Sequence, residues 1–150
     1  MSKIAVFAGS FDPITKGHEN IVRRALPLFD KIIVAVGRNA DKKSLFSVEQ
    51  RVDFIKKTFA DTPNVSVEAY DGLTVDFCKK HQANFLLRGL RSVADFEFER
   101  NIASINKKLL PNLETVFMCT DLAYSHISST IVRDILRQGG DVTDFLPFRL

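Results

Sequence analysis

One stretch decides the fold: Phe7-Ala8-Gly9-Ser10-Phe11-Asp12-Pro13-Ile14-Thr15-Lys16-Gly17-His18. It joins an apolar, strand-like run to the start of an amphipathic helix. Such a turn presents free backbone N–H groups and the positive end of a helix dipole, which together favour a bound anion. Gly9 and Gly17 allow the main chain to approach a ligand closely, and His18 can add a hydrogen bond or a positive charge. The stretch therefore predicts a phosphate site.

Apolar runs recur along the chain and alternate with helical patterns. We expect strands at residues 4–8, 31–36, 65–69, 85–87 and 115–119. Strands that alternate with helices indicate a parallel α/β sheet. We predict a single domain over residues 1–150, with a Rossmann-like doubly wound sheet of about five parallel strands and flanking helices.

The helices are predicted from apolar residues at helical spacing and from their end signals. The first should bury one face and be shortened or kinked by Pro27, and that face consists of Ile21, Val22, Ala25, Leu28 and Phe29. A second begins at the capping box of Ser47 and Gln50 and should bury Val52, Ile55 and Phe59.

Three further helices follow in the second half of the chain. A short one begins at Thr74, and a last one over residues 129–138 is stopped by Gly139-Gly140. Between them, a long helix over residues 93–109 should stack Phe98, Ile102, Ile105 and Leu109.

Composition favours a cytoplasmic globular protein. Of 150 residues, 45% are hydrophobic and 26% charged, and no apolar run approaches the roughly 20 residues that span a bilayer. Cys78 and Cys119 form no metal-binding or disulfide pattern. The net charge of +3 comes from scattered Lys and Arg residues, whereas nucleic-acid binding usually needs a basic stripe. A small phosphorylated ligand accounts for the basic residues equally well, and composition alone does not decide between these ligands. Our expectation is a small phosphorylated ligand, with neither a membrane nor a nucleic acid as partner.

Candidate ligand-binding residues fall where the predicted strands end. In open parallel sheets, ligands bind outside the carboxyl ends of the strands. These positions hold Ser10, Lys42, Thr74, Arg88 and the run Ser128-Ser129-Thr130. The glycine fingerprint of dinucleotide binding, the Walker phosphate loop and the serine nucleophile elbow are all absent from the sequence. Hydride transfer, Walker-type phosphoryl transfer and serine hydrolysis thus lack support.

Four segments together resemble the bacterial phosphopantetheine adenylyltransferases of the nucleotidyltransferase superfamily. They are Gly9–His18 in the opening stretch, Arg88-Gly89-Leu90-Arg91, Asp95-Phe96-Glu97-Phe98-Glu99 and Ile127-Ser128-Ser129-Thr130. The Thr-x-Gly-His motif alone is typical of the whole superfamily, and the other segments narrow the choice. The resemblance departs from the usual family sequence at Ser10, often a threonine, and at Phe98, often a tyrosine.

The resemblance implies an activity and its ligands. AMP would pass from ATP to 4′-phosphopantetheine, giving dephospho-coenzyme A and pyrophosphate without a covalent intermediate. Mg²⁺ would arrive bound with ATP, and no protein metal site is expected. The resemblance also implies a homohexamer, with dephospho-coenzyme A or coenzyme A as further ligands.

Residue roles carry over from the matching segments. His18 would stabilise the transition state at the α-phosphate, and Ser10 and Phe11 would contact both substrates. Phosphopantetheine would also meet Lys42, Thr74 and Arg88. The remaining ATP contacts would be Gly89, Leu90, Arg91, Glu99, Tyr124, Ser125, His126, Ile127, Ser128, Ser129 and Thr130.

Plainer readings of the same residues stay open. Taken alone, His18 could be a helix-cap neighbour, Arg88 a structural ion pair, and Ser128 an N-cap. Two other functions also stay open. One is a nucleotidyltransferase for another acceptor, such as nicotinamide mononucleotide or glycerol phosphate. The other is a noncatalytic nucleotide- or RNA-binding module.

Overall fold

The computed structural model describes residues 2–38 and 43–150. In this part of the chain a parallel sheet of five strands has the order β3-β2-β1-β4-β5. The strands are β1 (Ile4–Gly9), β2 (Lys31–Gly37), β3 (Val65–Tyr70), β4 (Phe85–Leu90) and β5 (Glu114–Cys119). The chain winds outward from β1 in one direction and then restarts at β4 on its other side. The predicted α/β fold is confirmed.

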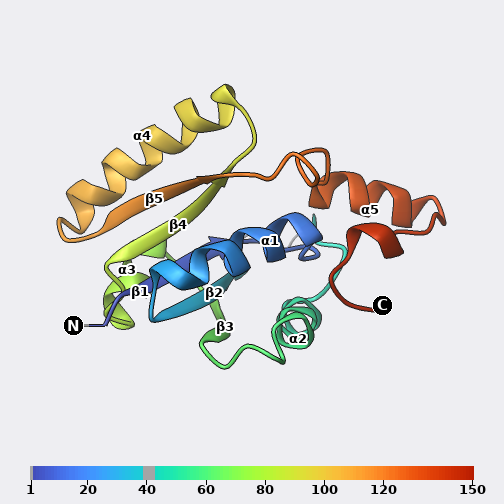
Figure 1. The fold of residues 1–150 in the computed structure, drawn as a ribbon, viewed down its shortest axis with the longest axis horizontal. Helices are drawn as coiled ribbons and strands as arrows, with labels where there is room; N and C mark the ends of the chain where they lie inside the picture. The colour runs from blue at the N-terminus through green and yellow to red at the C-terminus, as the bar shows by residue number, and fades with distance from the viewer. Residues whose placement is uncertain (1, 39–42) are drawn as a thin grey trace.

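Helices alternate with the strands (Figure 1). They are α1 (Lys16–Ala25), α2 (Val48–Thr58), α3 (Thr74–Lys80), α4 (Val93–Leu109) and α5 (Ser129–Arg137). Short 3-10 turns follow at Leu26–Leu28 and Thr143–Phe145. The predicted capping box is present at the start of α2, where the side chain of Ser47 accepts a hydrogen bond from the Gln50 amide and the Gln50 side chain accepts one from the Ser47 amide.

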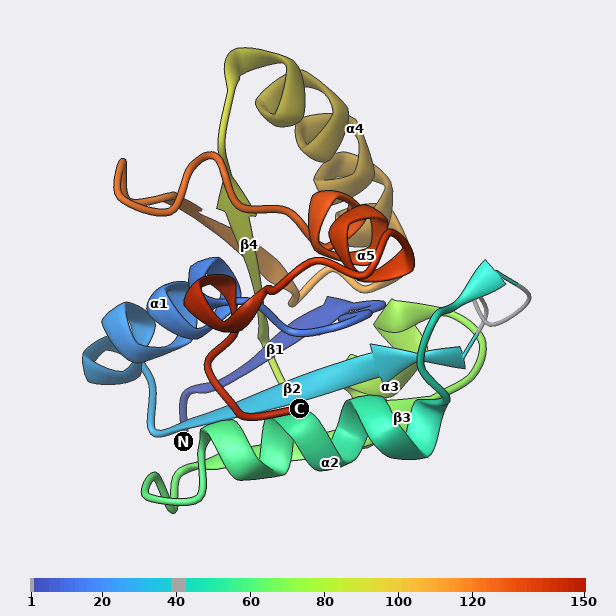
Figure 2. The same cartoon turned by 90° about the vertical axis from the view of Figure 1, so that its right-hand side faces the viewer.

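Both faces of the sheet are covered, as the alternation of side chains along each strand requires. One face of β1 and β2 packs against α1 and α2, through residues such as Val22 and Ile55. The opposite face packs against α3 through Val75 and Cys78. Figure 2 shows α4 and α2 on opposite sides of the sheet. In the described residues, no helix is long and apolar enough to cross a membrane.

Two predictions about burial are wrong. Leu28 is 52% exposed, because Pro27 ends α1 and the following 3-10 turn rotates Leu28 out of the apolar face. The stack predicted on α4 also fails: none of the residues of α4, all of them described, is buried. Phe98 is 67% exposed and Ile105 59%. Helical spacing identified an apolar face on α4, but it could not say what covers that face.

Strand β4 is longer than predicted. The apolar run stops at Leu87, yet ladder pairing to β5 continues through Leu90. Arg88 therefore lies within the strand instead of at its end. The backbone of Arg88 is fixed by its pairing with β5. Only its side chain is therefore available for contacts with a ligand or with other side chains.

Candidate active site

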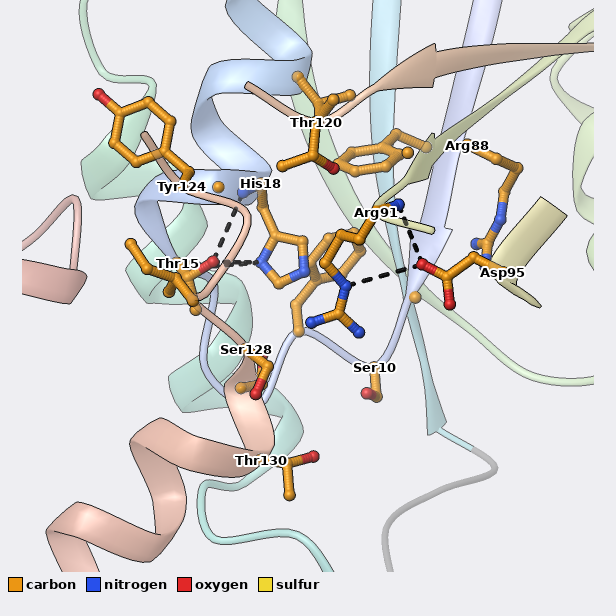
Figure 3. A pocket seen from close by; sticks show the side chains of 18 of the residues that line it. Ser10, Thr15, His18, Arg88, Arg91, Asp95, Thr120, Tyr124, Ser128 and Thr130 are labelled. Atoms are coloured by element: carbon orange, nitrogen blue, oxygen red, sulfur yellow. Dashed lines mark hydrogen bonds and ion pairs between the residues drawn. The ribbon is translucent and has the colours of Figure 1, made fainter. Parts of the chain in front are cut away.

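A cavity of about 390 Å³ lies where the winding of the sheet reverses, between the carboxyl ends of β1 and β4. This is the place where doubly wound sheets bind ligands. Figure 3 shows side chains from β4, α1 and the start of α5 directed into it. The lining residues are Phe7, Ala8, Gly9, Ser10, Phe11, Thr15, Gly17, His18, Ile21, Arg88, Gly89, Arg91, Asp95, Glu99, Thr120, Tyr124, Ile127, Ser128, Ser129 and Thr130.

The end of β1 and the loop that follows it are held by hydrogen bonds to their carbonyl groups. Side chains from three other elements donate to four carbonyls between Ala8 and Pro13. These bonds are Arg88 Nη1 to Ala8 at 2.6 Å, Arg51 Nη1 to Ser10 at 2.8 Å, Arg133 Nη1 to Asp12 at 2.7 Å and Ser129 Oγ to Pro13 at 2.8 Å. A buried carbonyl needs a hydrogen-bond partner, and here each partner also fixes the path of the loop.

Thr15 and His18 form a reciprocal cap at the start of α1. The Thr15 side chain accepts from the His18 amide, and the Thr15 amide donates to His18 Nδ1 at 3.0 Å. Because Nδ1 accepts this bond, the proton of a neutral ring sits on Nε2. Figure 3 shows that edge of the ring facing Arg91 across the cavity. The capping role and the cavity-facing role of His18 are both realised.

The surroundings of His18 keep its ring neutral. Its ring packs edge-on against Phe11, with centroids 5.1 Å apart. Burial first, and then the positive charges of Arg91 and Arg88, together lower the pKa of His18 from 6.5 to about 4. The free site therefore offers a neutral Nε2–H donor beside two cations.

Arg88 and Glu99 form a two-pronged ion pair in the cavity wall. Arg88 Nη2 and Nε lie 2.7 and 3.0 Å from the two carboxylate oxygens of Glu99. The structural ion pair considered for Arg88 is thus present, and Glu99, from α4, is its partner. The side chain of Glu99 is only 12% exposed and that of Arg88 31%. The remaining N–H groups of Arg88 can still donate to an anion.

A second cavity, of about 190 Å³, lies behind this ion pair. Ala8, Arg88 and Glu99 line both cavities, so the ion pair stands in the wall between them. The other lining residues of the second cavity are Thr74, Leu86, Ile102, Ala103, Asn106 and Thr115. Thr74 thus lies at this smaller, partly apolar cavity, where its hydroxyl contacts the Tyr70 hydroxyl at 2.9 Å.

The start of α5 forms the wall opposite β4. Ser128 caps the helix, with its Oγ accepting from the Ile131 amide at 3.2 Å. Its hydroxyl proton remains available to a ligand. The Ser129 hydroxyl is used on Pro13, so Ser129 can offer a ligand its backbone N–H only. This segment therefore caps α5 and lines the cavity at the same time.

Most of the predicted site residues meet at the large cavity. Leu90, Ser125 and His126 are not in its lining, and Ser125 donates instead to the Leu122 carbonyl. Lys42 lies outside the described residues. The sequence did not predict Thr120 or Asp95 as site residues, although Asp95 begins one of the four segments that resemble the family. Asp95 accepts from the Arg91 amide at 3.0 Å and its carboxylate lies 3.8 Å from the Arg91 guanidinium.

The fold and cavity define a class of proteins. The sequence model of the cytidylyltransferase-like family matches residues 6–135. A bifunctional NMN adenylyltransferase/ADP ribose pyrophosphatase from Francisella tularensis superposes with a TM-score of 0.75 at 20% identity, over 99% of this chain and 46% of that one. At that identity the likeness concerns the fold alone. The chain belongs to the cytidylyltransferase-like family.

Closer relatives identify the branch within this class. The phosphopantetheine adenylyltransferase of Flavobacterium psychrophilum is 56% identical over 143 residues, which is 95% of this chain and 94% of the relative. The corresponding protein of Cytophaga hutchinsonii is 52% identical over the full length of both chains. The chain belongs to the phosphopantetheine adenylyltransferases, as its four segments predicted.

The neutral state of His18 can be tested by titration. In the ligand-free protein, the His18 ring should stay unprotonated on acidification until about pH 4. An unfolded histidine takes up its proton near pH 6.5. Between these values the unfolded state binds more protons, so this group makes stability fall as the pH is lowered.

The measurement is an NMR titration of the histidine ring resonances, with His18 assigned by its loss in His18→Gln. That variant should also show a shallower fall of the unfolding free energy between pH 6.5 and pH 4. A His18 ring that titrates near 6.5 would contradict this account of its surroundings.

Proposed function

We propose that this protein transfers AMP from ATP to 4′-phosphopantetheine, giving dephospho-coenzyme A and pyrophosphate. One observation carries the proposal: two cavities adjoin at a cation, Arg88, and the larger holds the neutral donor His18. Family membership supports the same reaction. A reaction between two phosphorylated substrates needs adjoining sites that meet where the phosphates react.

The chemistry is a direct displacement at phosphorus. An oxygen of the phosphopantetheine phosphate attacks the α-phosphorus of ATP and forms the new P–O bond. The bond from that phosphorus to the bridging oxygen breaks, and its electron pair leaves with pyrophosphate. Alignment and charge stabilisation are the main demands on the protein. We assign no nucleophilic residue.

His18 would supply the charge stabilisation. Its Nε2–H would donate to an α-phosphate oxygen on which charge builds during transfer. Thr15 holds the ring in the required tautomer and orientation. Arg91, Phe11 and Ser128 line the same cavity and would hold the remaining phosphate oxygens.

The smaller cavity suits the pantetheine arm. Leu86, Ile102 and Ala103 offer apolar surface, and Thr74 and Asn106 offer groups that can hydrogen-bond its amides. Arg88 stands at the inner end, where its free N–H groups can meet the terminal phosphate. Lys42 and Ser10 keep their proposed role as further phosphate contacts.

Mg²⁺ would enter with ATP. Among the described residues, no three His, Cys, Asp or Glu side chains gather into a metal site, and the two carboxylates of the larger cavity, Asp95 and Glu99, face arginines. The phosphate oxygens of ATP are the hard ligands that Mg²⁺ prefers, and the ion would supply charge neutralisation on the polyphosphate.

The function is tested with purified protein, ATP, Mg²⁺ and phosphopantetheine, reading pyrophosphate release and product mass. Nicotinamide mononucleotide with ATP and glycerol phosphate with CTP serve as rival substrate pairs. Dephospho-coenzyme A should form with phosphopantetheine alone. Turnover with a rival pair only would replace the proposal, and RNA binding that weakens steeply with salt, without any turnover, would indicate a binding module.

His18→Ala should separate catalysis from binding. We expect kcat to fall about a hundredfold or more, because the lost donor acts on charge that develops in the transition state, while the Kd for ATP changes little. His18→Gln is the matched control, since a neutral amide can place an N–H near Nε2, and it should retain more activity. Equal losses of kcat and ATP affinity would make His18 a simple binding residue.

Arg88→Ala should act mainly on the acceptor. We expect the KM for phosphopantetheine to rise about tenfold or more, since a charge-assisted phosphate contact is lost, with ATP binding closer to normal. Arg24→Ala is the control: Arg24 donates to the Cys119 carbonyl and does not line either cavity. A variant in which only ATP binding suffers would reverse the assignment of Arg88.

We also propose a homohexamer in the cytoplasm, with α4 in an interface between copies. Its exposed apolar face supports this, because monomers rarely leave so many large apolar side chains in water. Phe98, Ile105 and Leu109 share that face, being exposed and spaced by seven and four residues. Light scattering after gel filtration should give six copies for the wild type and fewer for Ile105→Glu. Leu28→Glu, at an exposed position away from α4, should stay hexameric, and an unchanged mass for Ile105→Glu would exclude this face.

A further inference from the structure

Arg51 is a fully buried charge that the reaction outlined above does not use. It lies on α2, is 0% exposed, and is absent from the lining of both cavities. Its guanidinium donates from Nη1 to the Ser10 carbonyl at 2.8 Å and from Nε to the Phe46 carbonyl at 3.2 Å. Burying a guanidinium is unfavourable unless its hydrogen bonds are made, so its bond to a loop at the cavity needs an explanation.

The Ser10 carbonyl belongs to the same peptide unit as the Phe11 amide. In a trans peptide the C=O and the N–H point in opposite directions. Arg51 therefore draws the carbonyl to the side away from the cavity, and the Phe11 N–H points the other way. Within residues 2–38 and 43–150, that N–H donates to no protein acceptor.

Phe11 itself is held in an unfavourable backbone conformation. Its φ is 47°, in the left-handed region that residues other than glycine seldom adopt. Such a conformation persists only where the surroundings impose it. The ring of Phe11 packs on Phe7 and His18 on one side, and Arg51 holds the preceding carbonyl on the other.

We propose that Arg51 is a positioning residue: by holding the Ser10 carbonyl it turns the Phe11 N–H into the cavity, as a donor to a phosphate oxygen. The inference rests on the proposed function only in taking a polyphosphate as the ligand. Arg51 touches neither substrate and acts through the peptide it orients.

The geometry requires a guanidinium at this position. One planar group reaches carbonyls on two segments, the loop after β1 and the residue before the N-cap of α2. Asp12 bonds the same two segments from the other side, accepting from the Leu45 and Phe46 amides at 2.9 and 3.0 Å. A lysine keeps the charge but lacks the planar fork. It can therefore hydrogen-bond only one of the two carbonyls, and it would hold that carbonyl in a different direction.

The test follows the Phe11 amide by ¹⁵N NMR while inorganic pyrophosphate is added. In the wild type this resonance should move strongly downfield as the N–H meets a phosphate oxygen. In Arg51→Lys the shift should be largely lost, and the Kd for pyrophosphate and for ATP should rise about tenfold or more, while the Kd for adenosine, which has no phosphate, stays the same.

Arg23→Lys is the matched control. Arg23 also donates to a backbone carbonyl, that of Thr58 at 3.0 Å, but lies away from the cavity, so its replacement should cost stability without changing the Phe11 shift. Arg51→Gln, with a neutral donor, is measured beside Arg51→Lys in case one of them does not fold.

Two results would overturn the proposal. A Phe11 amide that does not move with pyrophosphate in the wild type would show that its N–H does not meet phosphate. If a folded Arg51 variant keeps the wild-type shift of the Phe11 amide and the wild-type ratio of ATP affinity to adenosine affinity, then Arg51 contributes to packing only. Neither result depends on turnover with phosphopantetheine, so failure of the proposed function would be seen separately.

Discussion

The site depends on the hydrogen bonds that the backbone carbonyl groups between Ala8 and Pro13 make. Backbone between Ala8 and Pro13 passes through the reversal point of the sheet, where it can expose either N–H or C=O groups to a ligand. Carbonyl oxygens beside a phosphate repel it, and N–H groups attract it. Side chains from α2, β4 and α5 bond four of these carbonyls. These contacts join the separate layers of the protein at the place where an anion would bind.

The same contacts explain the charge of the cavity. Arg88 and Arg91 face it, but each also pairs with a carboxylate on α4. His18, between them, stays neutral because burial and both cations disfavour a third positive charge. The site thus combines partly compensated cations with a neutral donor of fixed tautomer. An arriving polyphosphate can compete with the carboxylates for the arginines and accept a hydrogen bond from the neutral histidine.

The sequence predicts what depends on neighbouring residues. The capping box of Ser47 and Gln50, the strand before Ser10 and the cap at Ser128 all occur as expected, because each arises from contacts within a few positions. Arg51 and Arg133 were not predicted as parts of the site. Their carbonyl partners lie 41 and 121 positions away along the chain, and a lone arginine on an amphipathic helix resembles any solvated charge.

The burial of α4 could not be predicted for a different reason. Helical spacing finds an apolar face, but among the residues that the structure describes that face is left exposed. Yet α4 also carries Glu99, and its residues Ile102 and Asn106 line the smaller cavity. Helices gain most of their stability from packing, so further packing on the outer face of α4 would stabilise the helix that carries these groups. In the proposed hexamer, covering the outer face of α4 would also fix the wall between the cavities. Assembly and substrate binding would then be coupled through this helix, without any contact between the interface and the ligands.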